Sequence, residues 1–213
     1  MHPTIQQIID TQLLPLYYHD DYERCLQNIL ACYDAGVKVF EFTNRGTFAA
    51  AHFGRLKADL SATCADLKLG VGTIYTAEEA KVFAELGADF IVQPVCTLDV
   101  CNYCQTNQLP WIPGVMTLNE IYQAIKMGAE LVKIFPASFV GQDYIRNIRG
   151  PLPHANLMVT GGIDAEAEVI ASWLKSGVKV CGLGSQLFAD PQGLGPSGIT
   201  QKLSNILNAI QHD

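Results

Sequence analysis

Apolar stretches of strand length alternate along the chain with longer amphipathic stretches, and a glycine marks several of the junctions. The pattern is plainest where a helix-like stretch ends at a glycine and an apolar strand follows at once, as in Ala35–Glu41, Leu86–Val92, Met127–Lys133 and Ser176–Cys181. These units recur at intervals of roughly 45–50 residues, with weaker units between them. A repeating unit of this kind predicts a β/α architecture.

Eight strands are predicted, each followed by a helix, in one domain that spans residues 1–213. The strands are Leu13–Tyr17, Val37–Phe42, Leu69–Ile74, Phe90–Gln93, Trp111–Pro113, Leu131–Phe135, Leu157–Thr160 and Val178–Gly182. The helices lie in 22–35, 46–60, 76–86, 97–105, from 117 onward, 144–148, 164–175 and 199–210. Eight such units predict a TIM (β/α)8 barrel. The alternative, a doubly wound open sheet, would have fewer strands and one dominant glycine fingerprint.

The charge and the hydropathy narrow the range of functions. The chain has 14 basic and 21 acidic residues, and the net charge of −7 argues against nucleic acid as a partner, because such a binder needs a basic face. Residues 1–5 lack the basic-then-apolar pattern of a signal peptide, and no run of 18 apolar residues indicates a membrane span. We therefore expect a soluble, cytoplasmic protein without a membrane partner.

The seven cysteines are an odd number in a chain large enough to fold without disulfides, so reduced thiols are expected. Cys96, Cys101 and Cys104 have a C-x4-C-x2-C spacing that also occurs in iron–sulfur proteins. A fourth ligand is missing nearby, since the next cysteine is Cys181. Small buried or half-buried packing residues are therefore preferred over a metal or redox site.

Lys133 is the most unusual residue of the pattern, because it lies inside the apolar run Leu131–Phe135. An ammonium in such surroundings must be paired or lose its proton. A neutral amine in an apolar site is suited to Schiff-base chemistry. The alternatives are a lysine at a surface edge and a structural ion pair.

The alternation of side chains along the strands predicts partners for this lysine. If the bulky side chains of strands two and six face the helices, then Glu41, Thr73 and Lys133 converge inside the barrel, and Arg45 follows in the loop above Glu41. An amine can attack a ketone, a carboxylate can move protons, and a guanidinium can bind an acid group in a fork. This set predicts a site for an α-keto acid. A structural Glu41–Lys133 pair is the alternative, although buried ion pairs contribute little to stability.

Two glycine-containing loops follow the last two predicted strands. One is Thr160–Asp164, with Gly161 and Gly162, and the other is 182–185, with Gly184 and Ser185. Glycines at adjacent strand ends allow backbone N–H groups to approach an anion, which is the usual position of the phosphate site in these barrels. The loops therefore predict a phosphate site.

Taken together, these residues resemble the 2-keto-3-deoxy-6-phosphogluconate (KDPG) and 4-hydroxy-2-oxoglutarate (KHG) aldolase family. The matching segments span almost the whole chain in the order of the family. They are Glu41–Arg45, Gly70–Thr73, Gln93–Pro94, Ile112–Gly114, Val132–Ala137, Thr160–Ile163 and Gly184–Ser185.

The resemblance implies a role for each site residue. Lys133 would be the Schiff-base lysine and Glu41 the general acid and base, while Arg45 and Thr73 would hold the pyruvyl carboxylate. The remaining positions would form the pocket wall (Pro94, Phe135) and the phosphate site (Gly161, Gly162, Gly184, Ser185). The resemblance also implies a class I reaction that uses no metal or other cofactor, and a homotrimer.

The predicted function is a carbon–carbon lyase that cleaves KDPG to pyruvate and D-glyceraldehyde 3-phosphate, as in the Entner-Doudoroff pathway, and that also cleaves KHG to pyruvate and glyoxylate. Alternatives are an aldolase for 2-keto-3-deoxy-6-phosphogalactonate, a catalytically silent phosphate-sugar binding barrel, and a barrel phosphate isomerase or synthase. The chain departs from the family pattern near the expected distal end of the substrate or the pocket wall, at Gln93–Val95, Met116, Leu183 and Gln186. These departures bear on the substrate more than on the reaction.

Overall fold

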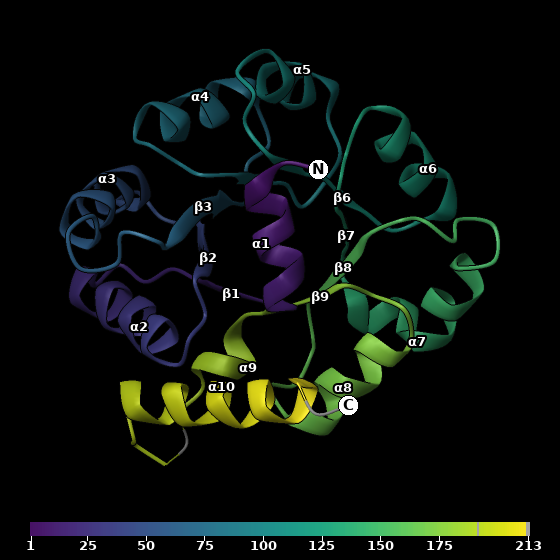
Figure 1. Cartoon of the computed structure of the whole chain (residues 1–213). Coiled ribbons are helices and arrows are strands. Elements are labelled where there is room, and N and C mark those ends of the chain that lie inside the picture. Colours follow the sequence, from purple (N-terminus) through teal and green to yellow (C-terminus); the bar gives the residue numbers. More distant parts are fainter. Residues whose placement is uncertain (191, 212–213) are drawn as a thin grey trace.

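A computed structural model describes residues 1–190 and 192–211. Its strands form a ring of parallel strands that is surrounded by helices (Figure 1). The strands are β1 Leu13–Tyr17, β2 Val39–Thr43, β3 Lys68–Gly72, β4 Ile91–Val92, β5 Trp111–Ile112, β6 Gly114–Val115, β7 Val132–Ile134, β8 Leu157–Thr160 and β9 Val180–Leu183. In the sheet they follow the order β5-β4-β3-β2-β1-β9-β8-β7-β6.

The ring closes at Pro113, which separates β5 from β6. The strand β5 pairs with β4, whereas β6 pairs with β7, so the two short pieces are halves of the single strand predicted here. Proline has no N–H to give to a ladder, which explains the interruption. Its carbonyl still accepts the backbone N–H of Lys133 at 2.9 Å. Eight β/α units therefore form the barrel, and the predicted TIM fold is confirmed.

The helices are α1 Pro3–Thr11, α2 Tyr22–Asp34, α3 Ala49–Leu60, α4 Ala77–Glu85, α5 Leu98–Thr106, α6 Leu118–Lys126, α7 Ala137–Ile148, α8 Ala167–Lys175, α9 Ser185–Phe188 and α10 Pro196–Gln211. Thr76 and Thr117 form capping boxes with Glu79 and Glu120. The helix α7 contains the predicted residues 144–148, with Gly141 in a non-helical conformation before them, whereas α8 begins later than the predicted 164. In the part of the chain described, no helix is long and apolar enough to cross a membrane.

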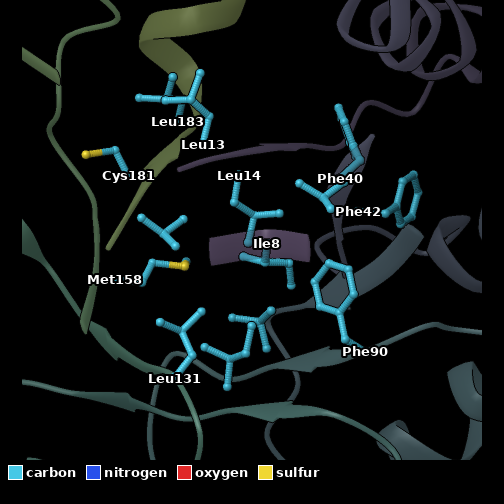
Figure 2. Close-up of a cluster of buried hydrophobic side chains, with 14 of the residues drawn as sticks. Ile8, Leu13, Leu14, Phe40, Phe42, Phe90, Leu131, Met158, Cys181 and Leu183 are labelled. Carbon is cyan, nitrogen blue, oxygen red and sulfur yellow. The ribbon is translucent and has the colours of Figure 1, made fainter. Parts of the chain in front are cut away.

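The helix α1 was not predicted, and it lies across the end of the barrel at which the strands begin (Figure 1). Its buried residues Ile5 and Ile8 join the barrel core. Figure 2 shows Ile8 among Leu14, Phe90 and Met158, which come from three sides of the ring. The helix therefore closes this end with apolar side chains, and the polar residues are left to the other end.

The strand register corrects one step of the sequence reasoning. Phe42 packs on Phe53 of α3, with ring centroids 5.8 Å apart, so the bulky side chains of β2 do face the helices as expected. Glu41, however, pairs with Gly70 and Thr43 with Gly72, and paired residues of parallel strands share a face. The glycines of β3 therefore face the interior. The alternation Leu69–Val71–Thr73 does not, and the predicted route by which Thr73 reaches the site was wrong.

Candidate active site

Lys133 and Glu41 face each other across the interior of the barrel. In the sheet order, three strands (β1, β9 and β8) separate β2 from β7, so the two residues come from opposite walls. Lys133 Nζ lies 3.5 Å from Glu41 Oε1, and the two side chains are 5% and 1% exposed. The predicted convergence of these two residues is present in the structure.

The pair is only partly satisfied by hydrogen bonds. Glu41 Oε2 is buried and has no hydrogen-bond partner within the described residues. Lys133 Nζ makes its one described side-chain hydrogen bond to Glu41, at the long distance of 3.5 Å, and lies 5.4 Å from the centroid of the Phe135 ring. A tight structural ion pair would satisfy more of these donors and acceptors. The arrangement leaves an amine and a carboxylate oxygen available to a ligand.

Arg45 and Thr73 meet just beyond the ends of β2 and β3. Arg45 Nε donates to Thr73 Oγ1 at 3.4 Å. Thr73 reaches this position because it follows the last residue of β3 and has a φ of 62°, which turns its side chain out of the strand alternation. The guanidinium thus lies at the carboxyl end of the barrel, as predicted, with a hydroxyl beside it.

A pocket of about 290 Å³ opens at the carboxyl ends of β1, β2, β7, β8 and β9. It is lined by Leu16, Tyr17, Tyr18, Thr43, Arg45, Phe135, Thr160, Gly161, Gly162, Ile163, Gly182, Gly184, Ser185 and Gln186. Thr43 and Phe135 each follow a member of the buried pair by two residues along its strand, so Glu41 and Lys133 lie one layer below the pocket.

The two glycine loops form one side of this pocket. Gly161 and Gly162 have φ values of 97° and 73°, a backbone region that other residues rarely adopt. The N–H of Ser138 donates to the carbonyl of Gly161 at 3.0 Å, which ties the β8 loop to the start of α7. Gly184 and Ser185 face the same space from β9. The predicted phosphate residues are therefore together, next to the buried pair.

Some predicted or flagged residues lie elsewhere. Pro94 does not line the pocket, and its backbone packs against Gly114 instead. Gln93 is fully buried and accepts a hydrogen bond from the Trp111 indole at 2.8 Å. Met116 and Leu183 are also not among the lining residues, and of the departures noted in the sequence only Gln186 is.

Sequence reasoning did not single out Tyr17 and Tyr18 for the site. Both line the pocket from the end of β1. Two adjacent tyrosines at the end of an apolar strand could have indicated pocket residues from the sequence. Thr160, noted only as part of a glycine motif, also contributes a buried hydroxyl, which has no partner in the structure described here.

The cysteines pack within the protein. Cys101 and Cys104 are buried, Cys96 is half-buried, and all seven thiols are free. Burial raises the pKa of Cys104 to about 12, which disfavours the thiolate that a metal would require. Among the described residues no three His, Cys, Asp or Glu side chains are grouped so as to hold a metal ion.

The fold and the site define a (β/α)8 barrel that carries a buried lysine–carboxylate pair below a pocket at the carboxyl ends of its strands. Residues 5–193 match the family model for the KDPG and KHG aldolases. The chain belongs to this aldolase family.

Several curated relatives are similar to this chain. A 2-dehydro-3-deoxy-phosphogluconate aldolase of Haemophilus influenzae is 32% identical over 168 residues, which cover 76% of this chain and 77% of the relative. A protein of the same name from Treponema pallidum is 29% identical, over 71% of each chain. A 2-dehydro-3-deoxy-6-phosphogalactonate aldolase of Escherichia coli is 31% identical over 59% of this chain and 61% of its own length.

Solved structures agree with these matches. The crystal structure of a 4-hydroxy-2-oxoglutarate aldolase/2-deydro-3-deoxyphosphogluconate aldolase has a TM-score of 0.82 and 26% identity, and the likeness covers 99% of both chains. A KDPG aldolase from Legionella pneumophila has a TM-score of 0.84 at 24% identity, covering 94% of this chain and 96% of its own, and supports the fold alone.

Proposed function

We propose that the protein is a class I aldolase that cleaves KDPG into pyruvate and D-glyceraldehyde 3-phosphate, with KHG as a second substrate that gives pyruvate and glyoxylate. The observation that carries the proposal is Lys133 inside the barrel, 3.5 Å from a carboxylate whose other oxygen has no partner among the described residues. The membership of the aldolase family and the names of the relatives support the same reaction.

The reaction begins at Lys133. The neutral amine attacks C2 of the keto acid, and loss of water gives an iminium. Glu41, directly or through a water, takes the proton of the C4 hydroxyl as the C3–C4 bond breaks, and the electron pair of that bond moves into the iminium to form an enamine. The aldehyde leaves, the enamine is protonated at C3, and water hydrolyses the resulting iminium to pyruvate and free Lys133.

The ends of the substrate are assigned to the two polar parts of the pocket. Arg45 and Thr73 bind the carboxylate next to C2, because a guanidinium and a hydroxyl supply fork-like donors. The distal phosphate lies against Gly161, Gly162, Gly184 and Ser185, where backbone N–H groups supply the donors. Phe135 forms the wall between the lysine and the pocket. None of these steps requires a metal or another cofactor.

Borohydride reduction in the presence of pyruvate tests the reaction class. The expected result is a stable mass increase on the peptide that contains Lys133, together with loss of activity in the wild-type protein. Lys133→Ala should be inactive and should not gain the mass. A fully active Lys133→Ala protein, or a wild-type Lys133 that remains unmodified, would contradict the proposal.

A further candidate substrate, 2-keto-3-deoxy-6-phosphogalactonate, is indicated by one of the relatives. The Escherichia coli relative is named as an aldolase of the phosphogalactonate compound. Comparing kcat/KM for the two phosphorylated keto acids, and for KHG without the phosphate, measures the contribution of each end of the substrate. We expect the highest value for KDPG and the lowest for KHG, because KHG loses the contacts of the glycine loops.

The proposal extends to the assembly and the setting of the enzyme. Residues 1–213 fold as one domain, which is supported by the single sheet and the continuous apolar core of the described residues. Three copies associate, which is supported by a group of exposed apolar side chains on one side of the barrel. The enzyme works in the cytoplasm, in the Entner-Doudoroff pathway, which the names of the KDPG aldolase relatives support.

A further inference from the structure

The residue that follows Arg45 is packed against the ring of Tyr18. A Cβ added to Gly46 would lie 2.1 Å from Tyr18 Oη and 2.5 Å from its Cε1 and Cζ atoms. The phenol therefore occupies the space in which a side chain at position 46 would lie. This contact joins the end of β1 directly to the backbone of the loop that carries Arg45.

The Tyr18 side chain also contacts two other aromatic rings and a carboxylate. Its ring meets Phe42 edge-on, with centroids 5.5 Å apart, and stacks on His52 at 6.3 Å. The phenol donates a hydrogen bond to Asp20 Oδ1 at 2.5 Å. Burial, and then the hydrogen bond to Asp20, raise the pKa of Tyr18 to about 12, so the phenol remains a donor throughout the pH range of an enzyme assay.

Arg45 itself has few fixed contacts. It lies beyond the end of β2, its backbone N–H donates to the carbonyl of Thr43 at 2.9 Å, and its side chain has one described hydrogen bond, the 3.4 Å contact with Thr73. Arg45 and Tyr18 line the same pocket. The side chain of Arg45 thus has few contacts of its own, and it adjoins a backbone at Gly46 on which Tyr18 packs.

We propose that Tyr18 is a positioning residue for Arg45. Its ring holds the backbone of Gly46, and through that backbone it sets the guanidinium where the group meets the carboxylate of the keto acid. The identity of this ligand rests on the proposed function, whereas the packing of the loop does not. A fork-like contact between guanidinium and carboxylate depends strongly on orientation, so a small displacement of the loop weakens binding.

Hydrogen exchange of the loop tests the packing without any reaction. In Tyr18→Leu, the amides of residues 44–50 should exchange at least about tenfold faster than in the wild-type protein, with the strands unchanged. Tyr18→Phe keeps the ring and should remain within about threefold of the wild type. Unchanged exchange in Tyr18→Leu would overturn the proposal, and so would faster exchange that spreads evenly over the barrel.

The dependence of borohydride inactivation on pyruvate concentration tests the consequence for the ligand. Tyr18→Leu should raise the half-saturating pyruvate concentration about tenfold, and Tyr18→Phe should restore most of it. The maximal inactivation rate should change less than threefold, because Lys133 is untouched. In an Arg45→Gln background the Tyr18→Leu effect should vanish, since a residue that acts through Arg45 has nothing left to position. An additive effect would overturn the proposal.

Two further variants guard against misfolding and nonspecific effects. Gly46→Ala places a methyl group against the phenol and should reproduce the Tyr18→Leu behaviour. Tyr33→Phe removes a similar phenol–carboxylate hydrogen bond, to Asp66, away from the pocket and should match the wild type. If the wild-type protein is not trapped by pyruvate and borohydride, the proposed function fails, and the exchange measurement still decides the role of Tyr18.

Discussion

At the scale of single residues, the interior of the barrel has room for its polar groups because glycines lie beside them on the neighbouring strands. A Cβ on Gly72 would be 1.8 Å from Glu41 Oε1, and a Cβ on Gly182 would be 2.2 Å from Thr160 Oγ1. Neither glycine has a positive φ, so each is required by the space and not by the backbone conformation. The absence of a side chain at Gly72 thus leaves the space in which the Glu41 carboxylate faces Lys133.

Gly72→Ala should therefore damage catalysis more than folding. The added methyl group must displace the Glu41 carboxylate, and we expect kcat/KM to fall about 100-fold, which corresponds to about 2.7 kcal/mol of transition-state stabilisation. Gly150→Ala is a matched control, because its nearest neighbour would be 3.6 Å away. Steady-state kinetics with thermal melting as a check measure the effect. Wild-type kinetics in Gly72→Ala would show that Glu41 does not need this position.

The sequence predicted single residues unevenly. The pairing of Lys133 with Glu41 could be predicted because a charge in an apolar strand is rare. The alternation of side chains then places each residue on the face of its strand that points into the barrel. Thr73 was correctly expected near Arg45, but the alternation used for β3 was wrong, since one strand alone does not reveal which face is the interior. Tyr18 was missed because its role depends on Gly46, which is remote in sequence.

At the scale of elements, α1 closes one end of the barrel, which no strand or outer helix does. Ile5 and Ile8 are 1% and 0% exposed and close the end of the barrel opposite the pocket. The helix starts at Pro3, a favoured first position, and its cap residue His2 accepts a hydrogen bond from the Thr4 N–H through Nδ1. The core below the active site is therefore completed by the N-terminal segment.

Ile8→Ala should separate stability from catalysis. Truncating this fully buried side chain leaves a cavity, and we expect the free energy of unfolding to fall by about 2–5 kcal/mol. Because Ile8 lies at the far end from the pocket, kcat below the melting temperature should be unchanged. Ile9→Ala, at a half-buried position of the same helix, should have a smaller effect in urea unfolding. Equal losses in the two variants would contradict the assignment of Ile8 to the core.

The elements that the sequence predicted well have a recognisable residue at one end, either a glycine or a capping threonine. Glycine at a helix end followed by an apolar run located four of the eight predicted strands, and Thr76 and Thr117 located two helix starts. The helix α1 has no apolar strand before it, and α9 is a single short turn, so neither produced a recognisable pattern. The division of the fifth strand into β5 and β6 is an effect of pairing on both sides of Pro113, which only the sheet reveals.

At the scale of the whole molecule, one side of the barrel is unusually apolar. Seven exposed apolar side chains lie on or just before the neighbouring helices α4, α5 and α6, and we call them the apolar face: Tyr75, Val82, Val95, Leu98, Met116, Leu118 and Tyr122. These helices are consecutive around the ring in Figure 1. A group of exposed apolar side chains on neighbouring helices favours association with another protein surface, and we expect a homotrimer of this chain to cover it.

Leu98→Glu/Tyr122→Glu should break this assembly. Both positions are well exposed, at 63% and 47%, so the charges should be tolerated in the monomer and repelled in an apolar interface. Sedimentation velocity should show a trimer for the wild type and a monomer for the double variant. The control Leu194→Glu changes a 47% exposed side chain just before α10. In Figure 1 the helix α10 lies on another side of the barrel from α5 and α6, so this variant should stay trimeric. A trimeric double variant would place the interface elsewhere, and a monomeric wild type would remove the trimer.

The closure of one end of the barrel by α1 also affects the order in which substrates bind and products leave. With that end closed by apolar side chains, we expect a substrate to approach Lys133 from the pocket lined by Phe135 and the glycine loops. In the proposed reaction the pyruvyl fragment is bonded to Lys133, below the pocket, and the aldehyde lies above it. We therefore expect the aldehyde to leave before pyruvate in the cleavage reaction, and pyruvate to bind before the aldehyde in the reverse reaction.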